Sequence, residues 1–284
     1  MDNIIQLHQE LSSGAYNHGG YQSFWVFDPK PRHIHKASVR DRLLHHAIHR
    51  ILYPFFDITF TSDSFSCRND KGTHKAMNRF RSFAYKVSKN NTKTCWVLKC
   101  DIRKFFENID HAVLLNILKA YISDTNTIWL LERVIKSFEK SPNKGLPLGN
   151  LTSQLFVNIY MNQFDQFIKH ELKIKHYLRY ADDFVVLSLI RLPLVELIPN
   201  IAVFLKDNLK LSLHPNKVFI KTLASGIDFL GWINFPDHRI LKTNTKRRMF
   251  KRIQNNTGKE TMQSYLGLLR HGNANTIRNE LLLH

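Results

Sequence analysis

Long hydrophobic runs are missing from this chain of 284 residues. No apolar stretch approaches the roughly 18 residues that a membrane-spanning helix needs. The first ten residues, MDNIIQLHQE, have no basic segment followed by an apolar one, so we expect no signal peptide. We also find no internal repeat and no low-complexity linker. These absences favour a cytoplasmic protein, bacterial or phage-encoded, that has no membrane partner.

Cysteine is scarce too. The three cysteines form no CxxC pair, which argues against a structural zinc site; they are Cys67, Cys95 and Cys100. An odd number of cysteines without an export signal fits a reducing cytoplasm. His45, His46 and His49 share one segment, but no carboxylate accompanies them at a suitable ligand spacing. We therefore favour ordinary polar or RNA-contacting histidines over a metal site.

Acidic residues are few relative to basic ones. The chain has 41 Lys and Arg against 23 Asp and Glu, a net charge of +18, which indicates a polyanionic partner such as nucleic acid. A solvated basic surface and an acidic membrane are the alternatives. The basic residues gather in three clusters, at residues 30–42, 68–81 and 242–252.

The remaining composition supports a folded protein. The chain is 43% hydrophobic and 12% aromatic, enough for a full core. Apolar spacing predicts helices at residues 39–52, 112–121, 152–171, 195–209 and 249–284, the last interrupted at Gly258 and Gly272. Residues 96–102, 177–187 and 226–235 are expected to form a buried strand and two hairpins. The middle of the chain is therefore expected to be an α+β unit, with helices on a small antiparallel sheet.

Three aspartates stand at chemically suggestive places in this pattern. Asp101 ends the first strand, while Asp182 and Asp183 lie where the 177–187 hairpin reverses. Adjacent like charges are costly unless a cation is present, so the pair indicates a site for hard divalent ions. The alternative is that Asp-Asp merely fills a turn, because aspartate is a favoured turn residue.

The surroundings of these aspartates resemble a known family. YADD (residues 180–183) is similar to the YxDD box of reverse transcriptases, and LKCDIRKFF (98–106) is similar to their first catalytic box. Three further segments resemble the fingers, nucleotide and primer-grip boxes: FSCRNDKG (65–72), LPLGNLTSQ (146–154) and FLGW (229–232). The boxes occur in the family's order within residues 30–284, and the ordered set is highly specific.

The resemblance implies a right-hand polymerase that copies RNA into DNA. We expect an N-terminal segment at residues 1–23, fingers at 24–94, a palm with a small antiparallel sheet at 95–235 and a short helical thumb at 236–284. The implied cofactor is a pair of Mg²⁺ ions about 3.5–4 Å apart, with Mn²⁺ as a substitute. The implied partners are template RNA, the primer–cDNA duplex and deoxynucleoside triphosphates.

The resemblance also assigns roles to residues. Asp101, Asp182 and Asp183 are expected to be catalytic and, with the carbonyl of Ile102, to bind the metal. The expected nucleotide-binding residues are Arg68, Lys71, Phe106, Leu148, Gly149, Gln154 and Lys217. For Arg68 and Lys71 the alternative is a solvated basic face, and for Phe106 it is a core aromatic. Phe229, Leu230, Gly231 and Trp232 would grip the primer, and Lys246, Arg247, Lys251 and Arg252 would follow the duplex.

Within the family, the chain resembles the enzymes of diversity-generating retroelements. LGNLTSQ (residues 148–154) ends in Ser-Gln, where group II intron enzymes usually have Ser-Pro, and YLGLLRHGN (265–273) is similar to this subfamily's ending. Because the sequence ends at His284, we expect no maturase or endonuclease extension of the kind that intron enzymes often have, and the sequence lacks the Val-Thr-Gly of retron enzymes. The resemblance implies misincorporation mostly opposite adenine and a small, basic, helical accessory protein.

Leu148 bears on accuracy. Many accurate reverse transcriptases have glutamine at the matching position, beside the nascent base pair, and an aliphatic side chain offers no such polar contact. Ordinary apolar packing is the alternative. Two other functions remain open: a free-standing enzyme of the group II intron or phage-defence type, and a non-enzymatic RNA scaffold. The apolar run at residues 189–194 is expected to be either a partner surface or an extra core contact.

Overall fold

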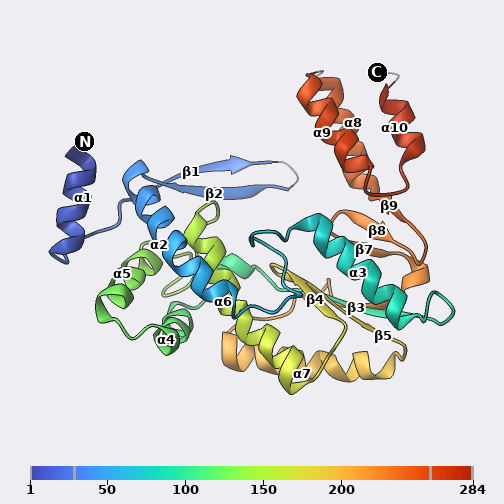
Figure 1. The fold of residues 1–284 in the computed structure, drawn as a ribbon, viewed down its shortest axis with the longest axis horizontal. Coiled ribbons are helices and arrows are strands. Elements are labelled where there is room, and N and C mark those ends of the chain that lie inside the picture. Colours follow the sequence, from blue (N-terminus) through green and yellow to red (C-terminus); the bar gives the residue numbers. More distant parts are fainter. Residues whose placement is uncertain (1, 28–29, 256–257, 283–284) are drawn as a thin grey trace.

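An antiparallel sheet lies at the centre of the molecule (Figure 1). The computed structural model describes residues 2–27, 30–255 and 258–282. The strand order across the sheet is β4 (Tyr177–Tyr180), β5 (Asp183–Ser188), β3 (Trp96–Asp101), β6 (Phe219–Thr222). Successive side chains of a strand point to opposite faces, and both faces of β3 are buried, so this strand is almost continuously apolar.

Helices cover both faces of this sheet. Leu98, Cys100 and Phe184 face the main core, which α6 (Leu151–Gln166) crosses before it ends in a π-helical turn, Phe167–Glu171. The same core contains side chains from α2 (Val39–Asp57), α4 (His111–Tyr121), α5 (Thr125–Lys136) and α7 (Leu192–Leu209). Within the described residues, no helix is both long and apolar enough to cross a bilayer.

The opposite face of the sheet packs on α3 (Thr73–Val87). Phe80 and Phe83 of α3 contact the cluster that contains Val97 and Val185. The expected boundary at residue 94 places α3 in the fingers, whereas its apolar face lies on the sheet that the palm is expected to contain. Helix α3 lies there because its apolar residues recur at helical spacing and form one apolar face, which is buried against that face of the sheet.

Two further β structures flank the central sheet. An antiparallel hairpin joins β1 (Tyr21–Val26) to β2 (Arg32–Ala37) beside α1 (Asp2–Ser12) and α2. A second sheet has the order β7 (Ile227–Phe229), β8 (Trp232–Asn234), β9 (Arg239–Leu241). The C-terminal helices pack on this sheet around Trp232 and Met249; they are α8 (Thr243–Asn255), α9 (Lys259–Leu269) and α10 (Asn275–Leu282). Figure 1 shows these helices and the β1–β2 hairpin projecting on the same side of the molecule.

The predicted elements of the middle of the chain are present, with shifted ends. The helix expected at residues 249–284 is three helices that begin at Thr243, and Gly258 precedes the second. Residues 256–257 and 283–284 of that prediction lie outside the described residues. The apolar run at residues 189–194 was expected to be either a partner surface or an extra core contact, and its residues differ in burial. Leu194 is buried in the core, while Ile190 and Leu192 are exposed.

A buried polar cluster joins the segment between α1 and β1 to α2. The carboxylate of Asp41 accepts hydrogen bonds from the hydroxyls of Tyr16 (2.9 Å) and Ser38 (2.6 Å). His18 lies beside it, and its Nε2 is 3.1 Å from Nε2 of His45 on α2. Burial, and then the neighbouring His18, lower the pKa of His45 to about 4.

His45 is expected to make folding stability depend on pH. In an unfolded chain histidine titrates near pH 6.5. Between about pH 6.5 and 4 the unfolded state therefore binds a proton at this histidine, whereas His45 of the folded state stays neutral. The contribution is fully present above pH 6.5 and is lost as the pH falls toward 4, by about 2–3 kcal/mol. His45→Leu should therefore flatten the decline of Tm between pH 7 and pH 4.5. An unchanged decline, equal to that of the exposed-site control His8→Gln, would contradict this prediction.

Candidate active site

The turn between β4 and β5 brings the three predicted aspartates to one edge of the central sheet. Tyr180 pairs with Asp183, which leaves Ala181 and Asp182 as the two turn residues, and Ala181 has the left-handed φ of 56°. Asp101 is the register partner of Asp183 on β3, and side chains of such partners point to the same face. The amide of Ile102 donates to the carbonyl of Asp182 at 3.1 Å, so the end of β3 is fixed against the turn.

The carboxylates at this edge are electrostatically strained. Burial, and then the charge of Asp101, raise the pKa of Asp182. Burial also raises the pKa of Asp183 to about 6, although the ammonium of Lys99 opposes the shift. Buried carboxylates that repel one another are stabilised by a nearby cation, so this edge of the sheet favours positive charge.

Two lysines partly neutralise the aspartates. Nζ of Lys217 lies 3.0 Å from both carboxylate oxygens of Asp101, and Nζ of Lys99 lies 3.2 Å from Oδ2 of Asp183. The other oxygen of Asp183, Oδ1, is buried and has no hydrogen-bond partner in the part of the chain that is described. A buried carboxylate oxygen without a donor is a suitable ligand atom for a hard cation.

The donor set is therefore chemically suited to a divalent metal, but the side chains are not grouped as ligands. Across residues 2–27, 30–255 and 258–282, no three His, Cys, Asp or Glu side chains form a cluster that could hold an ion. Instead, Asp101 is paired with Lys217 and Asp183 is paired with Lys99. The carboxylates fit Mg²⁺ by charge and atom type once they are turned toward a common point.

The expected nucleotide loop lies against the β1–β2 hairpin. The amide of His35 on β2 donates to the carbonyl of Leu148 at 2.9 Å, and Nδ2 of Asn150 donates to the carbonyl of His35 at 2.7 Å. Gly149 has a φ of 102°, and a Cβ there would come within 2.7 Å of the Ile34 side chain. Only glycine permits this backbone and this close approach.

Other expected nucleotide-site residues lie near this loop. Phe106 is half-buried, and its carbonyl accepts from the amide of Leu146 at 2.8 Å. Gln154 is half-buried in the first turns of α6. Arg32, at the start of β2, is close enough for its charge to lower the pKa of Asp182. Sequence reasoning counted Arg32 only as part of a basic cluster, because the hairpin that brings it to the aspartates was not predicted.

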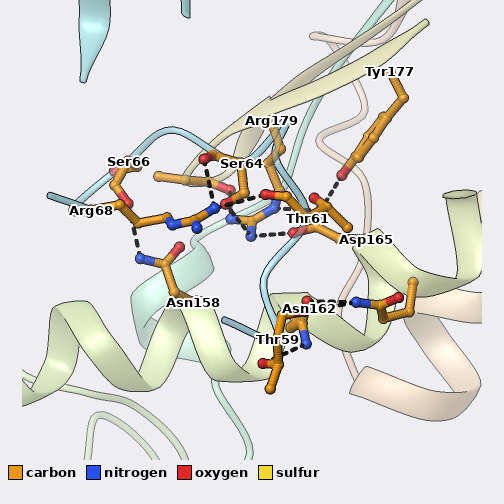
Figure 2. A network of polar contacts seen from close by, with 12 residues as sticks. Thr59, Thr61, Ser64, Ser66, Arg68, Asn158, Asn162, Asp165, Tyr177 and Arg179 are labelled. Atoms are coloured by element: carbon orange, nitrogen blue, oxygen red, sulfur yellow. Dashed lines mark hydrogen bonds and ion pairs between the residues drawn. The ribbon is translucent and has the colours of Figure 1, made fainter. Parts of the chain in front are cut away.

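Arg68 has a position different from the one expected for a phosphate ligand. Its side chain is only 5% exposed, and its Nε donates to Oδ1 of Asp57 at 2.7 Å. The same guanidinium donates to the carbonyls of Thr61 and Ser64, as Figure 2 shows. Its donors thus hold the loop of residues 58–66 to the end of α2. Lys71 is half-buried and donates to the carbonyl of Ser62 at 2.8 Å.

A buried arginine that sequence reasoning missed supports the catalytic turn. Arg179 is 1% exposed and forms a two-point ion pair with Asp165 of α6, at 2.8 and 2.6 Å (Figure 2). Its Nη1 donates to the carbonyl of Ala181 at 3.0 Å, in the turn that presents Asp182. The hydroxyl of Tyr177 donates to the same Asp165 carboxylate at 2.6 Å. This network fixes β4 to α6 and holds the left-handed residue of the turn.

The expected primer-grip residues are divided between core and turn. Phe229 and Trp232 are fully buried, Phe229 against Phe80 of α3 and Trp232 against the C-terminal helices. Between them, Leu230 and Gly231 form the β7–β8 turn, with positive φ values of 53° and 85°. Glycine tolerates such a φ, whereas leucine is strained there, as residues at functional turns often are.

The expected duplex-binding residues lie on α8. Met249 and Ile253 bury one side of this helix, and Arg247 and Lys251 are exposed one turn apart. Lys246 is 3.2 Å from a carboxylate oxygen of Glu280 on α10. Of the four expected duplex-binding residues, Arg247, Lys251 and Arg252 are exposed and Lys246 is half-buried.

The aspartate edge, the glycine loop beside it and the order of the boxes agree with a family match. Residues 28–234 match the family model described as reverse transcriptase (RNA-dependent DNA polymerase). The chain belongs to the reverse transcriptase family. Reverse transcriptases are RNA-directed DNA polymerases, so the prediction of an enzyme of this class is confirmed at the level of the family.

Relatives of this reverse transcriptase include intron-encoded proteins. Protein YkfC of Escherichia coli K12 is 25% identical over 282 residues, covering 84% of this chain and 71% of YkfC. The group II intron-encoded protein LtrA of Lactococcus lactis subsp. cremoris is 24% identical over 184 residues, covering 61% of this chain but 29% of LtrA. The chain thus spans less than a third of LtrA.

A solved telomerase has the same fold. The apo telomerase of Candida tropicalis superposes with a TM-score of 0.60 at 10% sequence identity, covering 87% of this chain and 54% of the telomerase chain. The likeness confirms the predicted right-hand polymerase fold, with α+β content and small antiparallel sheets.

Proposed function

We propose that this reverse transcriptase copies a template RNA into cDNA with frequent errors opposite adenine, as the enzymes of diversity-generating retroelements do. The observation that supports this subtype is Leu148, an aliphatic residue in the loop beside the β1–β2 hairpin. The Ser-Gln end of the same segment and the YLGLLRHGN sequence at residues 265–273 agree with it. We also propose that the enzyme acts in the cytoplasm and that it binds a small, basic, helical accessory protein.

The relatives favour a second candidate. LtrA is a group II intron-encoded protein, which favours a free-standing reverse transcriptase of the group II intron type; an enzyme of phage defence is the related alternative. The genes beside this one discriminate between the two functions. A template repeat paired with an adenine-substituted variable repeat supports diversification, whereas intron boundaries or defence genes support the second candidate.

The proposed mechanism places the chemistry at the aspartate edge. Asp101 and Asp182, assisted by Asp183 and the carbonyl of Ile102, would hold Mg²⁺, which when bound activates the primer hydroxyl and supports the leaving pyrophosphate. Lys217, which pairs with Asp101 in the structure, would donate a proton to the leaving pyrophosphate. Lys71 and the guanidinium of Arg32 are the proposed contacts of the triphosphate; Arg68 holds the adjoining loop instead.

The nucleic acid is proposed to lie along the side from which the hairpin and the C-terminal helices project (Figure 1). We propose residues 24–94 as fingers, 95–235 as palm and 236–284 as thumb, with α3 packed on the palm sheet. Arg247 and Lys251 would contact duplex phosphates, with Lys246 and Arg252 beside them. Leu230 and Gly231 would touch the primer, while Phe229 and Trp232 hold their turn in place.

Phe106 is expected to exclude ribonucleotides by its bulk. Phe106 follows Asp101 by five residues, and Phe106→Ala would open the space that a ribose 2′-hydroxyl is expected to occupy. Incorporation of ribonucleotides relative to deoxyribonucleotides should rise by about tenfold or more, which corresponds to roughly 1.4 kcal/mol of lost discrimination. Single-nucleotide extension with each triphosphate measures the ratio. Unchanged selectivity with a lower Tm would identify Phe106 as a core aromatic only.

Leu148 provides the test of the adenine-specific subtype. A glutamine amide at this position could hydrogen-bond the nucleotide or the template backbone, and such a bond nets about 0.5–1.5 kcal/mol. Leu148→Gln should therefore reduce misincorporation opposite template adenine several-fold, and less at other bases. Sequencing cDNA made on one adenine-rich RNA measures both proteins, and Leu148→Met is the matched control because it keeps the site apolar.

Two outcomes of this experiment would contradict the proposal differently. Equal loss of activity on all four template bases would mean that glutamine only disturbs packing. An unmodified enzyme without excess errors at adenine would refute the diversity-generating subtype and leave the reverse transcriptase assignment intact.

A further inference from the structure

Helix α2 is apolar on two faces, and only one of them is buried. Leu44, Ile48 and Phe56 point into the main core, at most 6% exposed. A second apolar row recurs every four residues on the outer side of the same helix. Val39 and Ile51 of this row are 75% and 72% exposed, and Leu43 and Phe55 are close to half-exposed. Ile58, 84% exposed, follows directly after the last residue of the helix.

This outer row has the form of a docking ridge. Residues four apart form a continuous ridge along a helix, and the row from residue 39 to 55 is roughly 24 Å long. Leu43, Ala47 and Ile51 are all exposed, so nothing in the described parts of the chain covers the middle of the ridge. Isolated exposed apolar residues are ordinary, but a contiguous ridge on one helix marks an interaction site.

A row of basic side chains runs beside the ridge. Arg42, His46 and Arg50 are also spaced by four, each three residues beyond a ridge position. His46 and Arg50 are exposed. Nε of Arg42 is buried and has no hydrogen-bond partner among the residues described. Across the same residues, no carboxylate forms an ion pair with any of the three. Anionic groups at helical spacing would complement these three side chains.

We propose that the outer face of α2 binds an amphipathic α-helix of a partner protein, one with an apolar stripe flanked by a row of carboxylates. The apolar stripe would lie in the groove beside the ridge of α2, as helices pack on one another. Its carboxylates would face Arg42, His46 and Arg50, where guanidinium groups favour two-point pairing with carboxylates. The net charge of +18 would further attract an acidic partner.

Charge argues against a second copy of this chain as the occupant. In an antiparallel pair of α2 helices each basic row would meet its own copy, and like charges across an interface repel. The helix has only two carboxylates to offset this. Asp41 is buried among Tyr16 and Ser38, and Asp57 is bound to Arg68. Nucleic acid is a poorer fit, because it would pair with the basic row but leave the aliphatic residues of the ridge uncovered, and Phe55 is the one aromatic ring that the ridge offers for stacking.

None of the ridge or basic-row residues contributes to the aspartate edge described above. The proposal therefore does not rest on the proposed function, and it also constrains the expected accessory protein. A basic partner would fit this face only through a helix that is locally acidic.

The test uses the full chain and two synthetic helical peptides of roughly 18 residues, about five turns. One peptide has leucine at every fourth position with a flanking row of glutamates, and the other has lysines in place of the glutamates. Fluorescence anisotropy should detect binding of the acidic peptide. Ile51→Glu should weaken it at least tenfold, while Val203→Glu, the same change at an exposed residue of α7, should not. Arg50→Glu should weaken the acidic peptide and strengthen the lysine peptide.

Other outcomes overturn the proposal. Absence of binding, equal binding by Ile51→Glu, or equal binding of the two peptides would each refute an acidic helix as the partner. A concentration-dependent dimer that Ile51→Glu abolishes would identify a second copy as the occupant. Cosedimentation with phosphatidylglycerol vesicles that Ile51→Glu abolishes would identify a lipid surface instead. Primer extension should be unchanged in Ile51→Glu, and thermal unfolding checks that this variant is folded.

Discussion

Asp182→Asn should abolish DNA synthesis without unfolding the protein. The change removes one negative charge from the edge where Asp101 and Asp183 also lie. Metal-assisted stabilisation of a transition state is worth several kcal/mol, so primer extension should fall by on the order of 10³-fold or more. RNA binding should be retained, because the expected phosphate contacts lie elsewhere, on α8. Primer extension and anisotropy with labelled RNA measure the two activities.

Stability provides the control for this prediction. In EDTA, Asp182 and Asp101 repel one another, so replacing one charged carboxylate by a neutral amide should leave Tm unchanged or raise it slightly. Asp207→Asn, at an exposed position of α7, should change neither synthesis nor stability. Substantial extension by Asp182→Asn would refute the metal-ligand role of Asp182. A large drop in Tm would mean that Asp182 supports the turn and that lost activity says little about metal binding.

The parts of the fold that the sequence predicts are those with strong local patterns. The strand ending at Asp101 and the hairpin around Asp182 depend on short apolar runs and a turn, and both are present. Helix α3 had an equally clear signal, with buried residues at Ala76, Phe80, Phe83, Ala84 and Val87. Several basic residues of α3 belong to the cluster at residues 68–81, so the segment was interpreted by its charge and no helix was predicted there. The β1–β2 hairpin lacked a signal, since four of the six residues of β1 are exposed and no alternation appears.

The roles of charged residues were harder to predict, because they depend on distant partners. Arg68 has the charge and geometry that a phosphate ligand needs, yet its guanidinium donates hydrogen bonds to Asp57 and to two loop carbonyls. Lys99 stands in an apolar strand, and only the β3–β5 pairing shows that it faces Asp183. Arg179 gave no signal at all, since Asp165 lies 14 residues away and meets it only after α6 packs on β4.

Outside the three aspartates, replacing Arg179 is expected to have the largest effect, and the effect is on the stability of the fold. Arg179→Met leaves Asp165 buried, charged and without its guanidinium partner, and losing one member of a buried pair costs about 3–5 kcal/mol. We expect a much lower Tm, or protein that does not fold. Arg179→Lys should recover little, because an ammonium group cannot make the two-point contact with Asp165 and also reach the Ala181 carbonyl.

A combined variant separates stability from positioning of the turn. Asp165→Leu, Tyr177→Phe and Arg179→Met together remove both the buried charges and the hydroxyl that depends on them, and apolar replacement of a buried ion pair is often neutral. Stability should return close to that of the parent enzyme. The carbonyl of Ala181 would still lack its donor, so the left-handed turn that presents Asp182 would be held less firmly. We expect primer extension to remain at least tenfold below the parent, mainly in kcat. Full recovery of both Tm and kcat would mean that Arg179 serves only the packing of β4 against α6.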